Sequence, residues 1–188
     1  MRKASPGIKG IRLACGLPLL FALSAGAVEV SFDGELLDRP CQVDPGSLNQ
    51  TIYFLTRPVK DFQFPPGKGP EEKFSIRLVD CDTNSVWKTV RLTFTGNSEP
   101  EMKELSAYFL RVSGVNQGKL AVGLLDTDGT TPLKLGDSHN AGKGTHIGDR
   151  TVSLNFKAFV QATPDALARK TVQPGEYSAV ANFELFYE

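Results

Sequence analysis

The sequence predicts an all-β domain of the immunoglobulin-like sandwich class. Short runs of alternating or β-branched residues recur along the chain, and turn-forming residues separate them. Only residues 100–105 and 163–169 have a helical composition, each for one or two turns. Seven or eight short strands with this spacing are typical of two packed sheets. The expected strands cover residues 51–56, 73–79, 89–95, 106–112, 120–125, 152–160 and 177–187.

The first 27 residues have the features of a signal peptide. Four basic residues precede an apolar run at 13–23, and Ala25-Gly26-Ala27 then provides an A-x-A cleavage signal. The apolar run is shorter than the roughly 20 residues that span a bilayer. We therefore expect residues 1–27 to be removed on export, no insertion into the membrane, and a mature chain that begins at Val28.

Length and charge limit the possible functions of the mature chain. Removing residues 1–27 leaves 161 of the 188 residues, enough for one domain with its own core. The removed segment carries four of the 21 basic residues and none of the 21 acidic ones, so the mature chain is acidic. Because it also lacks a basic cluster, nucleic acid is not an expected partner.

Two cysteines remain after export, Cys41 and Cys81. In an oxidising compartment, an even pair of cysteines predicts a disulfide. The two residues form neither a C-x-x-C motif nor a set of four zinc ligands, so we expect no metal and no redox site.

The mature chain opens with a strand that has one apolar face. Val28, Val30, Phe32 and Leu36 share this face with Gly34, and the other face is almost wholly polar. Two interpretations stay open. The strand is either the edge strand of its own sandwich, or it leaves the domain, since the pattern starts at the first mature residue.

The last strand alternates in the same way and runs to the end of the chain. The apolar positions on one face are Tyr177, Ala179, Ala181, Phe183, Leu185 and Tyr187. The pattern leaves open whether another strand of the domain completes the sheet beside it.

Together the two ends resemble those of the chaperone-usher pilin family. Gly34 stands seven residues before Cys41, Cys81 follows Arg-Leu-Val-Asp, Gly175 is fourteenth from the end and Tyr187 is penultimate. Further short motifs are similar to those of minor adaptor subunits of this family. These motifs lie at residues 36–41, 123–129, 138–140 and 162–167.

The resemblance implies an incomplete immunoglobulin-like fold that lacks its seventh strand. Residues 28–39 would be an N-terminal donor-strand extension and residues 40–188 the pilin domain. A periplasmic chaperone would first fill the groove beside the C-terminal strand. At the outer-membrane usher, the extension of an adjacent subunit would replace it, and the product would reach the cell-surface fimbrium. The donor residues implied are Val28, Val30, Phe32, Gly34 and Leu36. The groove residues implied are Gly175, Tyr177, Ala179, Ala181, Phe183, Leu185, Tyr187 and Glu188.

Other motifs favour ordinary structural roles. The glycines of residues 136–144 are spaced incorrectly for a phosphate loop. Residues 126–129 resemble the start of a calcium loop, but no glutamate follows at the required position, so we expect a hairpin turn. His139 and His146 are the only histidines, and we expect both to be solvated and to bind no metal.

Two other functions compete with a structural pilus subunit. One is a secreted single-domain adhesin or carbohydrate-binding module of immunoglobulin-like fold, for which Trp87, the only tryptophan, is the candidate sugar-stacking residue. The other is a periplasmic enzyme. We expect no enzymatic activity and no cofactor, because the sequence contains no Gly-x-Ser-x-Gly motif and no convergent set of acid and base residues.

Overall fold

A computed structural model describes residues 39–188 of the chain, and strand β8 (Val152–Ala162) is central to the larger of its sheets. β8 pairs with β2 (Glu72–Val79) on one side and with β6 (Leu120–Leu125) on the other. The short strands β1 (Gln42–Val43) and β4 (Phe109–Arg111) form the two edges. The sheet is antiparallel, with the order β1-β2-β8-β6-β4.

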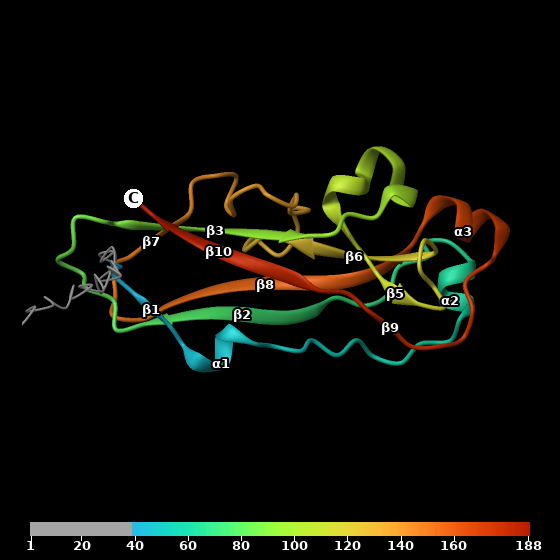
Figure 1. Cartoon of the computed structure of the whole chain (residues 1–188), viewed down its shortest axis with the longest axis horizontal. Coiled ribbons are helices and arrows are strands. Elements are labelled where there is room, and N and C mark those ends of the chain that lie inside the picture. The colour runs from blue at the N-terminus through green and yellow to red at the C-terminus, as the bar shows by residue number, and fades with distance from the viewer. Residues whose placement is uncertain (1–38) are drawn as a thin grey trace, which may run out of the picture. The chain divides into compact units, whose positions relative to one another are not determined.

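The second sheet has three strands in the order β10-β3-β7. β10 (Ala181–Tyr187) pairs along its whole length with β3 (Thr89–Gly96), whose other edge meets β7 (Thr145–His146). β9 (Tyr177–Ser178) pairs with β5 (Ser113–Gly114). Figure 1 shows β9 leading into β10 along the chain, so the two form one interrupted C-terminal strand.

The core lies between the two sheets. Leu78 on β2, Leu92 on β3 and Leu154 on β8 are each almost fully buried in one apolar cluster. The rings of Phe94 and Phe156, which come from opposite sheets, meet edge to face with their centroids 5.0 Å apart. This two-sheet packing confirms the predicted sandwich class.

Short helices connect the strands at turns that contain proline. The chain forms α1 (Pro45–Leu48), α2 (Lys60–Gln63), a 3₁₀ helix η1 (Pro100–Tyr108) and α3 (Pro164–Arg169). Three of these start at proline, whose fixed φ suits the first helical position. The two helical predictions are confirmed. No helix within residues 39–188 is long and apolar enough to cross a membrane.

Five of the predicted strands appear close to their expected bounds: 73–79, 89–95, 120–125, 152–160 and 177–187. The strand expected at 106–112 is shorter, because η1 continues to Tyr108 before β4 begins. The strand expected at 51–56 is wrong. Those residues are extended but pair with no strand of the described chain.

Candidate functional site: an open seam beside the C-terminal strand

Strand β10 has one free edge, because β3 is its only partner among residues 39–188. Just beyond the strand, Glu188 and Thr89 exchange both backbone hydrogen bonds, at 2.8 and 2.9 Å. Such mutual pairs alternate with non-bonded pairs along an antiparallel ladder. The odd-numbered residues from 181 to 187 therefore turn their N–H and C=O groups away from β3. This edge presents a row of backbone donors and acceptors to any strand added beside it.

The inner face of β10 only partly closes the core. Phe183, Leu185 and Tyr187 are half-buried and pack against the central apolar cluster, whereas Asn182 and Glu184 are exposed. This is the alternation that the sequence predicts for the strand. Apolar side chains that stay half-exposed beside a free strand edge indicate an incomplete core rather than an ordinary surface.

The start of the interrupted C-terminal strand continues the same face. Tyr177 and Ala179 are half-buried against the core, but Ala181, expected on the same face, is exposed. Gly175 lies before the strand at φ 148°, where a Cβ atom would come within 2.5 Å of the Val115 side chain. Any other residue at position 175 would therefore be strained. Its role in the structure is to admit the chain into β9.

The extended segment at residues 49–57 forms the opposite side of the opening. These residues make no backbone-to-backbone hydrogen bonds with the rest of the described chain. Ile52 and Phe54 are half-buried, whereas Tyr53 and Leu55 are 83% and 63% exposed. The segment thus has the period-2 pattern of a strand, with backbone groups that lack a strand partner. We call the opening between residues 49–57 and the interrupted C-terminal strand the open seam.

Two contacts link the C-terminal strand to the chain that precedes β2, one within the open seam and one at its end. At one, the rings of Phe54 and Tyr177 have centroids 6.3 Å apart. At the other, the Tyr187 hydroxyl donates a hydrogen bond of 3.3 Å to the carbonyl oxygen of Cys41. Burial raises the pKa of both tyrosines, and the Arg39 charge partly opposes this at Tyr187. The tyrosine hydroxyls therefore stay neutral and able to donate at physiological pH.

Glu188 is held in place by the chain itself. Its backbone oxygen accepts hydrogen bonds from the N–H groups of Lys88 and Thr89, at 2.6 and 2.8 Å. Its side-chain carboxylate forms an ion pair of 2.8 Å with Arg91. The sequence placed Glu188 among the groove residues, and the structure places it at the seam's end, already bonded to β3 and the loop before it.

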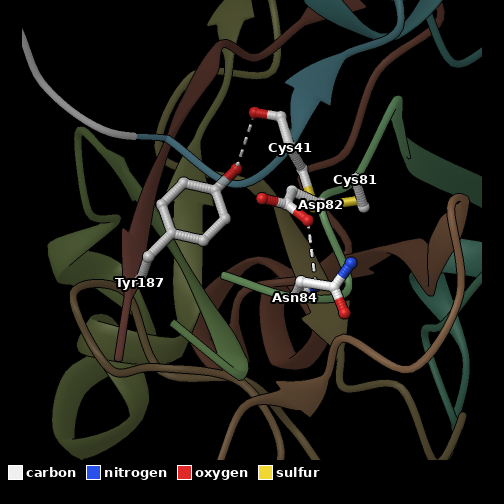
Figure 2. Close-up of a disulfide and its surroundings, with 5 residues drawn as sticks. All are labelled: Cys41, Cys81, Asp82, Asn84 and Tyr187. Atoms are coloured by element: carbon white, nitrogen blue, oxygen red, sulfur yellow. Dashed lines mark hydrogen bonds between the residues drawn. A yellow bond between two sulfur atoms is a disulfide. The ribbon is translucent and has the colours of Figure 1, made fainter. Parts of the chain in front are cut away.

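A disulfide closes the base of the domain near the same end of the seam (Figure 2). Cys41 and Cys81 are bonded and both almost fully buried, which confirms the predicted pair. Next to them, the N–H of Asp82 donates to the carbonyl of Pro40 at 2.7 Å. The point at which the chain enters the domain is thus fixed covalently and by a hydrogen bond, next to Tyr187.

The residues predicted to form the donor strand lie outside the described part of the chain. This applies to Val28, Val30, Phe32, Gly34 and Leu36. The donor role of these residues and the acceptor role of the open seam both stay predictions.

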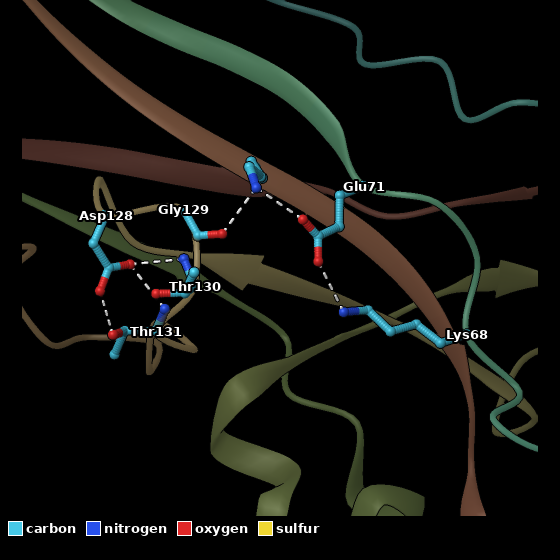
Figure 3. A network of polar contacts seen from close by, with 7 residues as sticks. Lys68, Glu71, Asp128, Gly129, Thr130 and Thr131 are labelled. Carbon is cyan, nitrogen blue, oxygen red and sulfur yellow. Dashed lines mark hydrogen bonds and ion pairs between the residues drawn. The ribbon is translucent and has the colours of Figure 1, made fainter.

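The polar cluster of Figure 3 is structural in character. Lys157 on β8 donates to the Glu71 carboxylate and to the Gly129 carbonyl, each at 2.9 Å, and Glu71 also binds Lys68 at 3.1 Å. The two lysines lower the pKa of the Glu71 carboxyl, chiefly through these hydrogen bonds. The cluster ties the turn after β6 to the start of β2.

Residues 126–129 form the predicted hairpin turn. The Gly129 N–H donates to the Asp126 carbonyl at 2.8 Å, and Leu125 bridges to Pro132 across the turn. The Asp128 carboxylate accepts from the hydroxyl and N–H of Thr131 and from the N–H of the residue before it, which lowers its pKa to about 2. Within residues 39–188, no group of three or more potential metal-ligating side chains is close enough to hold an ion.

The expectation for one histidine is wrong. His139 is fully buried, edge to face with Phe156 at a centroid distance of 6.0 Å, whereas His146 is exposed as expected. His139 is buried because the loop that carries it folds back over β3. Residues 49–57 were not predicted to line the open seam. Their β-branched and aromatic composition predicts a strand, but nothing in it indicates that no strand within residues 39–188 pairs with them.

Comparisons with known proteins agree with this architecture. A family model described as fimbrial protein matches residues 30–188. The chain is 51% identical to Protein PrsK and 49% identical to Fimbrial adapter PapK, both of Escherichia coli, over 92% of this chain and 97% of each relative. Among solved structures, the P pilus rod subunit PapA is similar with a TM-score of 0.64 and 24% identity, over 80% of this chain and all of that one. The structural likeness shows a shared pilin fold.

Proposed function

The chain belongs to the fimbrial protein family, and on that premise we propose that it is a minor adaptor subunit of a chaperone-usher pilus. About half of its residues are identical to those of a fimbrial adapter, over almost the whole of both chains, and this identity supports the adaptor role. The family is one of structural pilus subunits, so we propose no catalytic activity.

The open seam is the observation that carries this proposal. A free strand edge on β10 faces an extended segment without strand pairing, and half-buried apolar side chains lie between them. One inserted strand can pair with both sides of the open seam. It must offer backbone donors and acceptors on its two edges and apolar side chains at every second position. Addition of a strand from another polypeptide supplies both, through backbone hydrogen bonds for affinity and side-chain pockets for specificity.

The N-terminal segment of a neighbouring family member has the required chemistry. In this chain that segment carries Val28, Val30, Phe32 and Leu36 on one face. Each such side chain contributes roughly 1.5–3 kcal/mol if fully buried. Gly34 lies in the middle of the run, where the backbones of donor and acceptor would approach too closely for a side chain.

The same seam serves two partners in turn. A periplasmic chaperone fills it first and keeps the incomplete core from aggregating. An adjacent subunit then displaces the chaperone strand at the outer-membrane usher, so that each subunit is completed by its neighbour. Homologues of this family form surface pili, and we propose that the chain follows the periplasmic route to the same location.

The test is strand exchange in vitro. Chaperone-bound pilus subunits encoded alongside this chain are mixed with a synthetic peptide of residues 28–39, and chaperone release is followed by gel shift. The native peptide is expected to release the chaperone from one of them. A Gly34→Leu peptide is expected to fail, since it adds a side chain where the backbones must meet.

A parallel deletion separates a donor strand from an edge strand. If residues 28–36 leave the domain, deleting them keeps the chaperone-bound subunit folded and soluble but unable to complete the next subunit. Aggregation of the deletion variant, together with no exchange by the peptide on any subunit tested, would return these residues to their own sheet and refute the proposal.

A further inference from the structure

The loop that joins β2 to β3 is attached to the point where the chain enters the domain. Its second residue, Cys81, is bonded to Cys41. The next residue, Asp82, donates its N–H to the Pro40 carbonyl at 2.7 Å (Figure 2). Whatever protein holds the segment that precedes Arg39 must therefore lie close to this loop.

Hydrogen bonds within the loop fix its conformation. The Asp82 carboxylate accepts from the N–H of Asn84 at 2.9 Å, and the Ser85 hydroxyl oxygen accepts from the N–H of Trp87 at 3.2 Å. The Lys88 ammonium reaches back across the loop to the Thr83 carbonyl at 2.6 Å. The loop is thus anchored by the disulfide at one end and by β3 at the other, with three hydrogen bonds between them.

This hydrogen-bonded loop displays an apolar tip. Val86 is 81% exposed and Trp87 39% exposed, and neither belongs to the buried core clusters or to the two sides of the open seam. Single exposed apolar residues are common and need no explanation. A valine and the chain's only tryptophan side by side on a braced loop are different, because large, pre-organised aromatic side chains are typical anchors of protein interfaces.

We propose that Val86 and Trp87 form a second contact with the pilus subunit that accepts this chain's N-terminal segment. This inference rests on the proposed function and adds a docking surface to it. If Leu36 is the last donor residue, four residue steps separate it from Pro40, which limits their Cα separation to about 14 Å. The accepting subunit is thereby tethered against the loop.

Because the bound N-terminal segment holds the accepting subunit near the loop, the surface of that subunit that contacts the loop can be small. Once the segment is bound, contact with the loop becomes intramolecular, and effective concentrations in the millimolar range make even a small apolar patch sufficient. The matching surface on the acceptor is therefore a small apolar patch at the point where the donor segment leaves its seam. Charge contributes little, because Asp82 and Lys88 flank the tip with opposite signs.

The single tryptophan gives a direct readout. The chain is produced with 5-fluorotryptophan and purified with its unlabelled chaperone, so that one ¹⁹F resonance reports on Trp87. The acceptor is the chaperone-bound subunit from which the peptide of residues 28–39 releases the chaperone. After exchange, the Trp87 resonance is expected to shift and to lose its accessibility to a soluble paramagnetic quencher.

Exchange kinetics provide the second readout. Val86→Ser and Trp87→Ser are expected to slow chaperone release by the intact chain about tenfold, as the loss of one buried apolar side chain implies. Leu105→Ser is the matched control, since Leu105 is 52% exposed but lies on η1, and its rate should stay that of the wild type. The free peptide lacks the loop and reports the rate of strand exchange alone.

The outcomes separate the two proposals. If the peptide releases the chaperone from no subunit, the proposed function fails and this inference fails with it. If exchange proceeds but the Trp87 signal and the variant rates do not change, only the loop contact is refuted. Protection of Trp87 already in the chaperone complex, or a shift of its resonance on adding oligosaccharides, would also overturn it by assigning the loop to the chaperone or to a sugar.

Discussion

His139 shows how one buried side chain can stand in for a missing strand residue. The backbone N–H of His139 donates to the Leu92 carbonyl at 3.0 Å, and the ring Nδ1 accepts from the Leu92 N–H at 3.0 Å. Because Nδ1 accepts, the proton lies on Nε2, which donates to the Thr145 hydroxyl at 2.8 Å. The neutral ring thus completes the ladder of β3 at its second edge.

This arrangement makes the domain sensitive to acid. Burial lowers the pKa of His139, and the Asp126 charge opposes this only in part. Above the pKa of about 6.5 that the imidazole has in the unfolded chain, His139 is neutral in both the folded and the unfolded state. It then contributes nothing to the pH dependence of stability. Below it, the unfolded chain takes up a proton that the folded chain refuses, so stability falls by up to about 1.4 kcal/mol per pH unit.

We predict that His139→Gln removes this slope. The measurement is urea unfolding, at several pH values between 5 and 8, of the peptide-filled subunit, which is this chain with a donor-strand peptide of an adjacent subunit bound in its open seam. The variant should also lose about 1–3 kcal/mol at pH 7.5, because the Leu92 N–H loses its acceptor. His146→Gln is the matched control, since His146 is exposed. An unchanged slope in His139→Gln would show that other groups cause the acid sensitivity.

Sequence patterns predicted burial and disulfide pairing where these follow from alternation or from the number of cysteines. The burial of Phe183, Leu185 and Tyr187 follows from strict alternation, and the pairing of Cys41 with Cys81 follows from an even count in an exported domain. The burial of His139 depends on a glycine-rich loop that folds back over a strand more than 40 residues earlier. No local pattern contains that information.

The same limit applies to whole elements. The C-terminal strand was predictable because alternation, length and terminal position all agree for residues 177–187. Residues 51–56 are equally rich in β-branched and aromatic residues, yet they form no ladder within residues 39–188. A sequence specifies which residues can be a strand, whereas pairing also needs a neighbouring strand, and none pairs with this segment among residues 39–188.

The C-terminal strand carries the second prediction. Deleting residues 183–188 removes most of the free edge of β10 and half of the apolar side of the open seam. The truncated subunit should no longer copurify with the chaperone from periplasm. Glu184→Ala, which changes an outward-facing residue of the same strand, should copurify as the wild type does. Stoichiometric recovery of the truncated subunit would place the binding edge elsewhere.

At the scale of the whole molecule, the sandwich class was predictable but its incompleteness was not. The count of alternating segments gave seven or eight strands, which is enough for a closed sandwich. Only the family resemblance implied a missing strand. The structure gives the reason in physical terms. One of the counted segments has no strand partner among residues 39–188, and short pairs such as β5 with β9 are too brief to be recognised from sequence.

The disulfide carries the third prediction. Exported material should show no free thiol after unfolding, because Cys41 and Cys81 are bonded. Replacing both by serine should lower the stability of the peptide-filled subunit by roughly 3–4 kcal/mol, the chain-entropy value for a loop of about 40 residues. Thiol titration and urea unfolding measure the two effects. Two reactive thiols in each mature wild-type chain would contradict the first.

The position of this bond also determines how the domain bears tension. A pull on the N-terminal segment reaches Cys41 and passes directly to Cys81, because the two are covalently joined across a separation of 40 residues. It continues through the braced loop into β3, and from β3 into β10, whose other edge faces the open seam. The chain between the cysteines lies outside this path. While the bond is intact, a pull on the N-terminal segment cannot straighten the loop of chain between the two cysteines, so the domain resists extension at the point where the chain enters it.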